Sequence, residues 1–214
     1  MARYAVKEAE TFKDQIAKAA LRLVADRGAD SVTTSDVVKT MGITRATMAR
    51  HCPSEDDLWL AVAALIERRM KLGWAAVAAG EPSPSGRLRS LLAVQVGLIM
   101  DMPALRSLLL SRSLHADNAA LRRGLCDVRR AFRARLVEVL TEGQHAGQFR
   151  EGLEPGVTAD RIMETIQGMV VSWSLNQQAG DPVEEVWMRL DAFLHGTADR
   201  AQAGPIEHDQ RGMS

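Results

Sequence analysis

Apolar residues recur along most of the chain at the three- and four-residue spacing of amphipathic helices. The first stripe runs from Phe12 to Leu23, and Gly28 is suited to end that helix. Further stripes predict helices over about 34–40, 44–51, 54–79, 87–100, 117–147, 157–178 and 182–200. Because no segment shows the alternation of a half-buried strand, we predict an all-α protein of about nine helices.

Turn-forming residues divide these helices into a small head and a larger body. Pro53 separates the short N-terminal helices from a long one, whose start Ser54 can cap. The Gly80–Gly86 segment, rich in Gly, Pro and Ser, is the clearest loop. We expect four parts: a head over 8–53, a connecting helix over 54–79, a body over 87–200 and a flexible tail over 201–214.

The composition is that of an ordinary globular protein, with 46% hydrophobic and 25% charged residues. Cys52 and Cys126 lie far apart and form no CxxC, so the sequence predicts neither a zinc site nor a disulfide. We interpret both as buried, unreactive thiols of a reducing compartment. Without a signal segment or an apolar run long enough to cross a bilayer, we expect a cytoplasmic protein with no membrane partner.

The formal net charge is zero, which at first argues against a nucleic-acid partner. The charge is unevenly distributed, however. Residues 1–52 hold nine Lys and Arg against six Asp and Glu, so the rest of the chain carries the compensating acidic excess. A mildly basic head of this kind permits binding to phosphates.

Residues 33–52 predict two short helices joined by a glycine turn. Thr33 and Asp36 have the three-residue spacing of a capping box, and Gly42 allows a sharp bend at low steric cost. The second helix starts near Arg45, and the N-terminal residues of such a helix reach base edges when it enters the major groove. Apolar contacts between the helices are expected from Val37, Val38, Ile43 and Met48. We interpret this segment as a DNA-binding helix-turn-helix.

The segment resembles the head of the TetR family of repressors. The chain matches the family pattern in unbroken register at Gly28, Thr33, Asp36, Val37, Gly42–Met48, His51 and Ser54–Leu58. Residues 87–200 resemble the family only in length and helical pattern. Two positions depart from it: Ala49 replaces a Tyr that commonly touches a phosphate, and Cys52 replaces a Phe that packs the end of the recognition helix. Arg50 is a candidate to take over the lost phosphate contact.

The resemblance implies a homodimeric repressor that binds a pseudo-palindromic double-stranded operator and is released by a small-molecule effector. Dimer contacts are expected from about 157–178 and 182–200. The expected DNA contacts are Thr33, Thr34, Lys39, Thr44, Arg45, Thr47, Arg50 and His51. The first three would hold phosphates and Arg45 a guanine edge, whereas His51 is equally compatible with packing. The alternative is a helical ligand- or protein-binding module that has lost sequence-specific DNA binding.

An effector pocket is expected between the body helices, and its apolar composition favours an apolar or aromatic ligand. For each candidate lining residue, packing in the core is the alternative interpretation. The candidates are Trp74, Met100, Met102, His115, Cys126, Met163, Met169 and Trp173. The helix over about 117–147 also carries a run of arginines outside its apolar stripe, which is typical of a solvated face. The alternative is that one or two of them pair with an anionic effector. The run comprises Arg122, Arg123, Arg129, Arg130, Arg133 and Arg135. No motif predicts a catalytic centre, a metal site or a cofactor, so we expect no enzyme.

Overall fold

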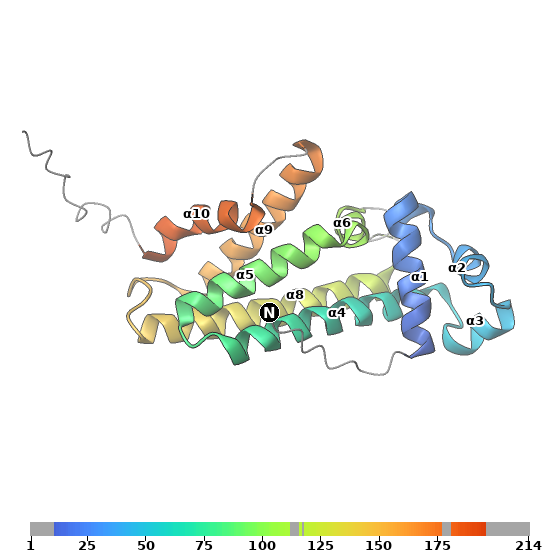
Figure 1. The fold of residues 1–214 in the computed structure, drawn as a ribbon, viewed down its shortest axis with the longest axis horizontal. Coiled ribbons are helices and arrows are strands. Elements are labelled where there is room, and N and C mark those ends of the chain that lie inside the picture. The colour runs from blue at the N-terminus through green and yellow to red at the C-terminus, as the bar shows by residue number, and fades with distance from the viewer. Residues whose placement is uncertain (1–10, 112–115, 117, 177–180, 196–214) are drawn as a thin grey trace, which may run out of the picture.

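The structure is a computed structural model, and it describes residues 11–111, 116, 118–176 and 181–195. In these residues the chain forms nine α-helices, one short 3-10 helix and no strand, which confirms the all-α prediction (Figure 1). The helices are α1 (Phe12–Arg27), α2 (Thr34–Met41), α3 (Arg45–His51), α4 (Glu55–Gly80), α5 (Pro84–Asp101), α6 (Pro103–Leu110), α8 (Ala119–His145), α9 (Pro155–Asn176) and α10 (Pro182–His195). The expected tail over 201–214 and the candidate His115 lie outside the described residues.

The head consists of α1, α2 and α3, which lie together at one end of the elongated molecule (Figure 1). Thr11 starts α1 with a capping box to Asp14, and Gly28 ends it with a φ of 84°, which favours glycine. The 3-10 helix η1 (Ala29–Ser31) then leads into α2. Because α1 packs on α2, α4 and α6, it is the element that joins the head to the rest of the chain.

The body is built on α4, α5 and α8, each of which packs against the other two. The helices run side by side along the long axis of the molecule (Figure 1). These helices supply several of the fully buried side chains of the core, among them Leu88, Leu92, Leu136 and Leu140. α9 packs on α8, and α10 packs on α5 and α9, so these two helices form an outer layer over one side of the bundle.

Two helix starts differ from the sequence-based boundaries because of local capping. The Ser83 hydroxyl accepts a hydrogen bond from the Gly86 backbone N–H at 3.0 Å, so α5 begins at Pro84 and the expected loop over 80–86 is reduced to three residues. The Asn118 side chain accepts from the Leu121 N–H at 2.7 Å and fixes the start of α8.

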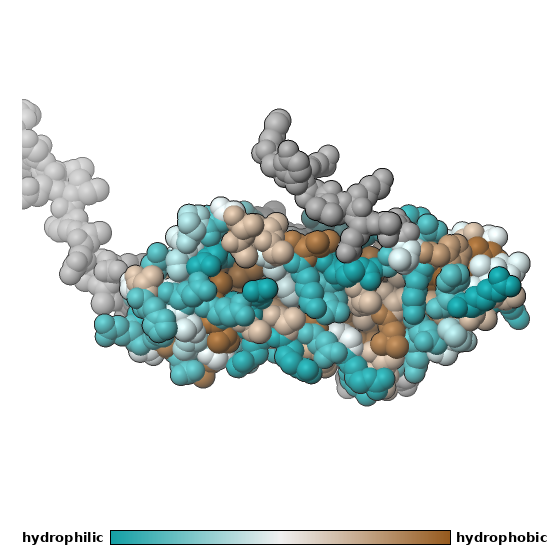
Figure 2. Space-filling view, turned by 90° about the horizontal axis from the view of Figure 1, so that it is seen from below, coloured by the Kyte–Doolittle hydropathy of each residue, from teal (hydrophilic) through white to brown (hydrophobic). Residues whose placement is uncertain are grey.

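The surface is mixed in character. Figure 2 shows that on one long face apolar residues form separate small areas among hydrophilic ones. Among the described residues no single helix is long and apolar enough to cross a membrane, and α5 with α6 meets that test only as a pair bent by 89°.

Candidate nucleic-acid interface and ligand cavity

Two short helices and their turn form a rigid unit in the head. The Thr33 hydroxyl accepts from the Asp36 N–H at 3.3 Å, and the Asp36 carboxylate accepts from the Thr33 N–H at 3.1 Å, so the expected capping box starts α2. Gly42 ends α2 in the left-handed region at φ 63°. The Thr44 hydroxyl accepts from the Thr47 N–H at 3.1 Å and caps α3. The helix, turn and helix predicted over 33–52 are therefore present.

Buried side chains hold the recognition helix α3 in place. Met48 points from α3 into the core with 4% exposure, and Val37 of α2 is fully buried. Cys52, which ends α3, is also buried, and burial raises the pKa of its thiol. The Phe12 ring of α1 lies 4.7 Å from the ring of His51. An aromatic side chain from α1 thus packs against the end of the recognition helix, one residue before the small Cys52.

The residues expected to contact DNA lie on the surface of this unit. Arg45 is the first residue of α3 and is exposed, as are Arg50 and His51 in its last turn. Thr44 is exposed and Thr47 half-buried, and their hydroxyl oxygens lie 2.9 Å apart. Thr33 and Lys39 are exposed and Thr34 is half-buried. Ala49, where the family pattern has Tyr, is exposed too.

The start of α2 carries a stabilised carboxylate. The hydrogen bond from the Thr33 hydroxyl, followed by that from its backbone N–H, holds the pKa of Asp36 below its usual value. Arg27 at the end of α1 forms an ion pair with the same carboxylate at 3.6 Å. Because these hydrogen bonds and the ion pair favour the ionised form of Asp36, the cap of α2 is weakened when this carboxylate is protonated.

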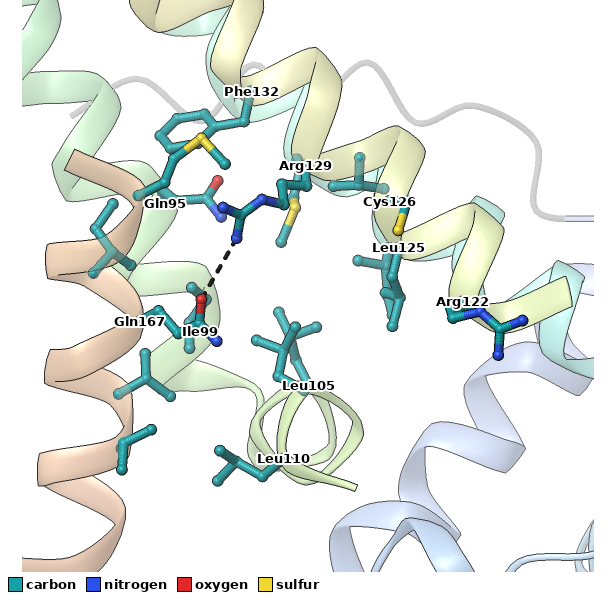
Figure 3. A pocket seen from close by; sticks show the side chains of 18 residues that line it. Gln95, Ile99, Leu105, Leu110, Arg122, Leu125, Cys126, Arg129, Phe132 and Gln167 are labelled. Carbon is teal, nitrogen blue, oxygen red and sulfur yellow. Dashed lines mark hydrogen bonds between the residues drawn. The ribbon is translucent and has the colours of Figure 1, made fainter. Parts of the chain in front are cut away.

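The short helix α6 connects the head to a cavity in the body. On one side of α6, the Ser107 hydroxyl oxygen accepts a hydrogen bond from the Ala29 N–H of η1 at 3.0 Å. The Ser111 hydroxyl, directly after α6, donates to the carboxylate of Asp30. On the other side, Leu105 and neighbouring leucines of α6 line the cavity (Figure 3). The helix α6 therefore lies between the cavity and the α1–η1 junction.

The cavity has a volume of about 280 Å³ and lies between α4, α5, α6, α8 and α9. That volume is at the lower end of the range for small-molecule sites, about 300–1,000 Å³. Most of the described wall is aliphatic, and Phe132 supplies the one aromatic ring among its described residues. The apolar lining comprises Ile66, Met70, Ile99, Leu105, Leu109, Leu110, Leu125, Val128, Phe132, Met163, Ile166, Val170 and Val171.

Two of the residues expected to line a pocket, Cys126 and Met163, lie on this wall. Trp74 lies behind it, stacked on Phe132 at 5.3 Å between ring centroids and donating its indole N–H to Gln95 at 3.3 Å. The other described candidates are also absent from the lining: Met100, Met102, Met169 and Trp173. Met169 is in the core, and the Trp173 indole N–H is directed to Glu185 at 3.0 Å.

The polar groups of the cavity were not predicted as pocket residues, although the arginine run was singled out. Gln95 is 8% exposed, and its amide oxygen accepts from Trp74. Arg129 donates to the Gln167 side-chain oxygen at 3.5 Å, between α8 and α9 (Figure 3). Arg122 lies nearer the start of α8. A glutamine in an otherwise apolar helix stripe, as at Gln95, was the available signal in the sequence.

The two cysteines differ in environment, which corrects the expectation that both are buried. Cys52 is buried in the head core, whereas Cys126 is exposed on α8 at the cavity. Cys126 lies on the polar side of the α8 stripe formed by Leu121, Val128 and Phe132, because its position is out of phase with those residues.

Comparison with known protein families gives two matches along this chain. Residues 16–62, which include α2, α3 and the turn, match the family described as bacterial regulatory proteins, tetR family. Residues 79–188 match the C-terminal region of YsiA-like proteins. Together the two matches cover the head and most of the body.

Two characterised relatives align over most of the chain. The fatty acid metabolism regulator protein of Bacillus subtilis is 24% identical over 174 residues, which are 79% of this chain and 87% of the relative. The nucleoid occlusion factor SlmA of Marinobacter nauticus is 24% identical over 162 residues, 74% of this chain and 81% of the relative.

Solved structures share the fold. A putative TetR-family transcriptional regulator from Rhodococcus sp. superimposes with a TM-score of 0.73 at 20% identity, over 84% of this chain and 97% of that chain. FadR from Bacillus subtilis, solved in complex with stearoyl-CoA, superimposes with a TM-score of 0.70 at 22% identity, over 85% of this chain and 97% of that chain. A putative transcriptional regulator from Saccharomonospora viridis, solved in complex with choline, superimposes with a TM-score of 0.66 at 23% identity, over 85% of this chain and 94% of that chain.

Proposed function

This chain belongs to the TetR family of bacterial regulatory proteins, and on that premise we propose that it is a repressor that a small-molecule ligand releases from its operator. The family consists of DNA-binding transcriptional regulators, and its members are not classed as enzymes. The observation that carries the proposal is the exposed start of α3, which buried Met48 and Val37 hold on a rigid unit. A cytoplasmic location follows from the proposed action on operator DNA.

The exposed residues of the unit divide into two groups by position. Arg45, Thr44 and Thr47 are at the start of α3, where a helix in the major groove meets base edges, and Arg45 has the bidentate geometry that suits guanine. Thr33, Thr34, Lys39, Arg50 and His51 lie where we propose contacts to the phosphate backbone. Such contacts fix the register of the protein on the duplex.

We propose a homodimer through α9 and α10, as expected for a pseudo-palindromic site. Support comes from large apolar side chains that α9 and α10 leave exposed. They are Val157, Val171, Leu175 and Met188, with Leu175 at 77% and Met188 at 68% exposure. Exposed apolar side chains on adjacent helices are typical of an interface.

The cavity between α4, α5, α6, α8 and α9 is the proposed ligand site. Binding there would favour the arrangement of α6 and α1 that places the two heads at the wrong spacing for the operator. The ligand shifts the equilibrium only by the difference between its affinities for the two arrangements. The related structures hold an anionic thioester in one case and a cationic quaternary ammonium compound in another, so family membership by itself leaves the charge of the ligand open.

A salt titration on DNA tests the proposal. The observed binding constant should fall linearly with salt concentration on logarithmic axes, because each phosphate contact releases counterions. An operator-containing fragment should also bind more tightly than random DNA of equal length. A flat response on both fragments would instead support a binding module without DNA recognition, the alternative raised by Ala49 and the neutral net charge.

A further inference from the structure

The charged groups among the described lining residues of the cavity are all of one sign. Among its described lining residues, the ionisable groups with charge at neutral pH are Arg122 and Arg129, and none is Asp or Glu. Both arginines come from α8, and both are exposed, so they belong to the mouth of the cavity and not to its interior. Among the described lining residues, those of the interior are apolar apart from Gln95. The site thus combines an apolar interior with a cationic mouth.

Arg129 is directed across the mouth toward α9 (Figure 3). Its hydrogen-bond partner is the neutral amide of Gln167, at 3.5 Å. Arg133 holds the carboxylate of Asp160 in a bidentate pair at 2.7 and 2.9 Å. Arg133, and to a smaller extent Arg129, lower the pKa of this carboxylate. Because Arg133 already compensates that carboxylate, the guanidinium of Arg129 makes the mouth electropositive.

A cationic ligand does not fit this lining. Cations in proteins are bound by carboxylates or by cages of several aromatic rings. The described lining contains no carboxylate and a single ring, that of Phe132. A ligand without charge would make no charge-assisted hydrogen bond with the guanidinium of Arg129, which donates here to the amide oxygen of Gln167.

We propose that the cavity takes an amphipathic ligand with an apolar chain in the interior and an anionic oxygen head, carboxylate or phosphate, bound by Arg129 with Gln167 at the mouth. This inference rests on the proposed function of the cavity. Guanidinium groups bind both kinds of oxyanion by charge-assisted, often bidentate hydrogen bonds. The amide N–H group of Gln167 supplies a second donor on the opposite wall.

Four probes with the same ten-carbon chain test the charge of the head: decanoate, decanoyl-coenzyme A, 1-decanol and decyltrimethylammonium. Their dissociation constants are measured by calorimetry on the full-length protein. Decanoate or decanoyl-coenzyme A should bind at least about tenfold more tightly than the alcohol or the ammonium compound. Preference for decanoate indicates a carboxylate head, whereas preference for the thioester indicates contacts with the coenzyme A part, which carries the phosphates.

Three variants test the role of Arg129. Arg129→Met keeps the apolar stem and should weaken the anionic probe about tenfold while leaving 1-decanol within about twofold, and Arg129→Lys should restore part of the loss. Arg130→Met is the matched control, because Arg130 follows directly on α8, is 78% exposed and pairs with Asp127. The bound anionic probe should also slow alkylation of Cys126 by iodoacetamide, since this thiol lies at the same mouth.

The proposal is overturned if no probe binds, if the alcohol or ammonium probe binds as tightly as the anionic ones, or if Arg129→Met and Arg130→Met behave alike. Circular dichroism first establishes that each variant is folded, as expected for substitutions at the exposed Arg129 and Arg130. If the unaltered protein itself does not bind operator DNA, the proposed repressor function fails, whereas the charge preference of the cavity is still decided by the calorimetry.

Discussion

Arg45 combines three properties that a base-reading residue needs. It starts α3, its side chain is exposed, and the helix that carries it is fixed by the Thr44 cap and by buried Met48. A guanidinium on a fixed helix loses less conformational freedom on binding than one on a loop. The head therefore offers Arg45 as its best-positioned group for contact with a guanine.

Replacing Arg45 by Ala should lower operator affinity by about 1–3 kcal/mol and relax the preference at one base pair. Lys39→Ala, at a proposed phosphate contact, should instead weaken binding to all sequences alike and reduce the salt dependence. Fluorescence anisotropy with single-base operator variants separates the two patterns. Lys71→Ala serves as control, because Lys71 lies on α4 in an ion pair with Glu67. Unchanged affinity in Arg45→Ala would remove this residue from the interface.

Single residues show where sequence reasoning was limited. The caps at Thr33, Thr44 and Ser54 were predictable, because capping depends on residues three positions apart. The packing of Phe12 near the end of α3 was not, because it joins residues far apart in the sequence. The exposure of Cys126 was also missed, since a lone cysteine gives no signal of its own and only its phase on α8 decides its side.

At the scale of elements, α6 is the helix that contacts both the cavity and η1 beside the head. Its leucines face the cavity, and Ser107 accepts a hydrogen bond from the buried backbone N–H of Ala29. Ser107→Ala leaves that N–H without its partner, so we expect the free energy of unfolding to fall by about 1–3 kcal/mol. Urea unfolding followed by circular dichroism measures the change.

The exposed Ser35 on α2 provides the control for this prediction, and Ser35→Ala should change stability by no more than about 0.5 kcal/mol. Ser107→Ala should also reduce the ligand-induced loss of DNA affinity, because the link between α6 and η1 is weakened. If Ser107→Ala is as stable as the unaltered protein, the hydrogen bond with Ala29 contributes nothing to the free energy of unfolding. The contact would then be excluded as the route from the cavity to the head.

The capping boxes make helix starts sensitive to acid. Hydrogen bonds from the Thr33 and Ser54 hydroxyls hold the pKa values of Asp36 and Asp57 below the ordinary 3.8. Since the pKa is lower in the folded than in the unfolded state, the stabilisation is complete above about pH 5 and is lost as the pH falls through 3.8 and below. The melting temperature of Asp36→Asn should therefore differ from that of the unaltered protein most at neutral pH. A difference that is the same at all pH values would contradict the prediction.

The order of the helices was largely predictable, because each has a clear apolar stripe and a cap or breaker at its ends. What could not be predicted is how they enclose the cavity. Its wall takes residues from five helices, and a stripe residue such as Trp74 or Met169 is equally suited to the core behind the wall. Periodicity identifies the buried side of a helix but not the neighbour that covers it.

At the scale of the whole molecule, the outer layer of α9 and α10 is the proposed contact with a second copy. Leu175→Glu places a charge on the most exposed of its apolar side chains and should yield a monomer with strongly reduced operator affinity. Sedimentation or light scattering measures the oligomeric state. Leu72→Glu, at a leucine of 57% exposure on α4, is the matched control and should remain dimeric. Monomers in both variants, or in neither, would place the interface elsewhere.

The 26-residue helix α4 gives the molecule a lever arm. Its first turns pack on α1, and Ile66 and Met70, further along the same helix, form part of the cavity wall. An α-helix of this length extends about 39 Å, so a tilt of only about 5° displaces its far end by about 3.4 Å. That displacement equals the rise of roughly one base pair along DNA. A ligand that moves the cavity wall by a small angle can thus take a head out of register with its half-site without any change inside the head.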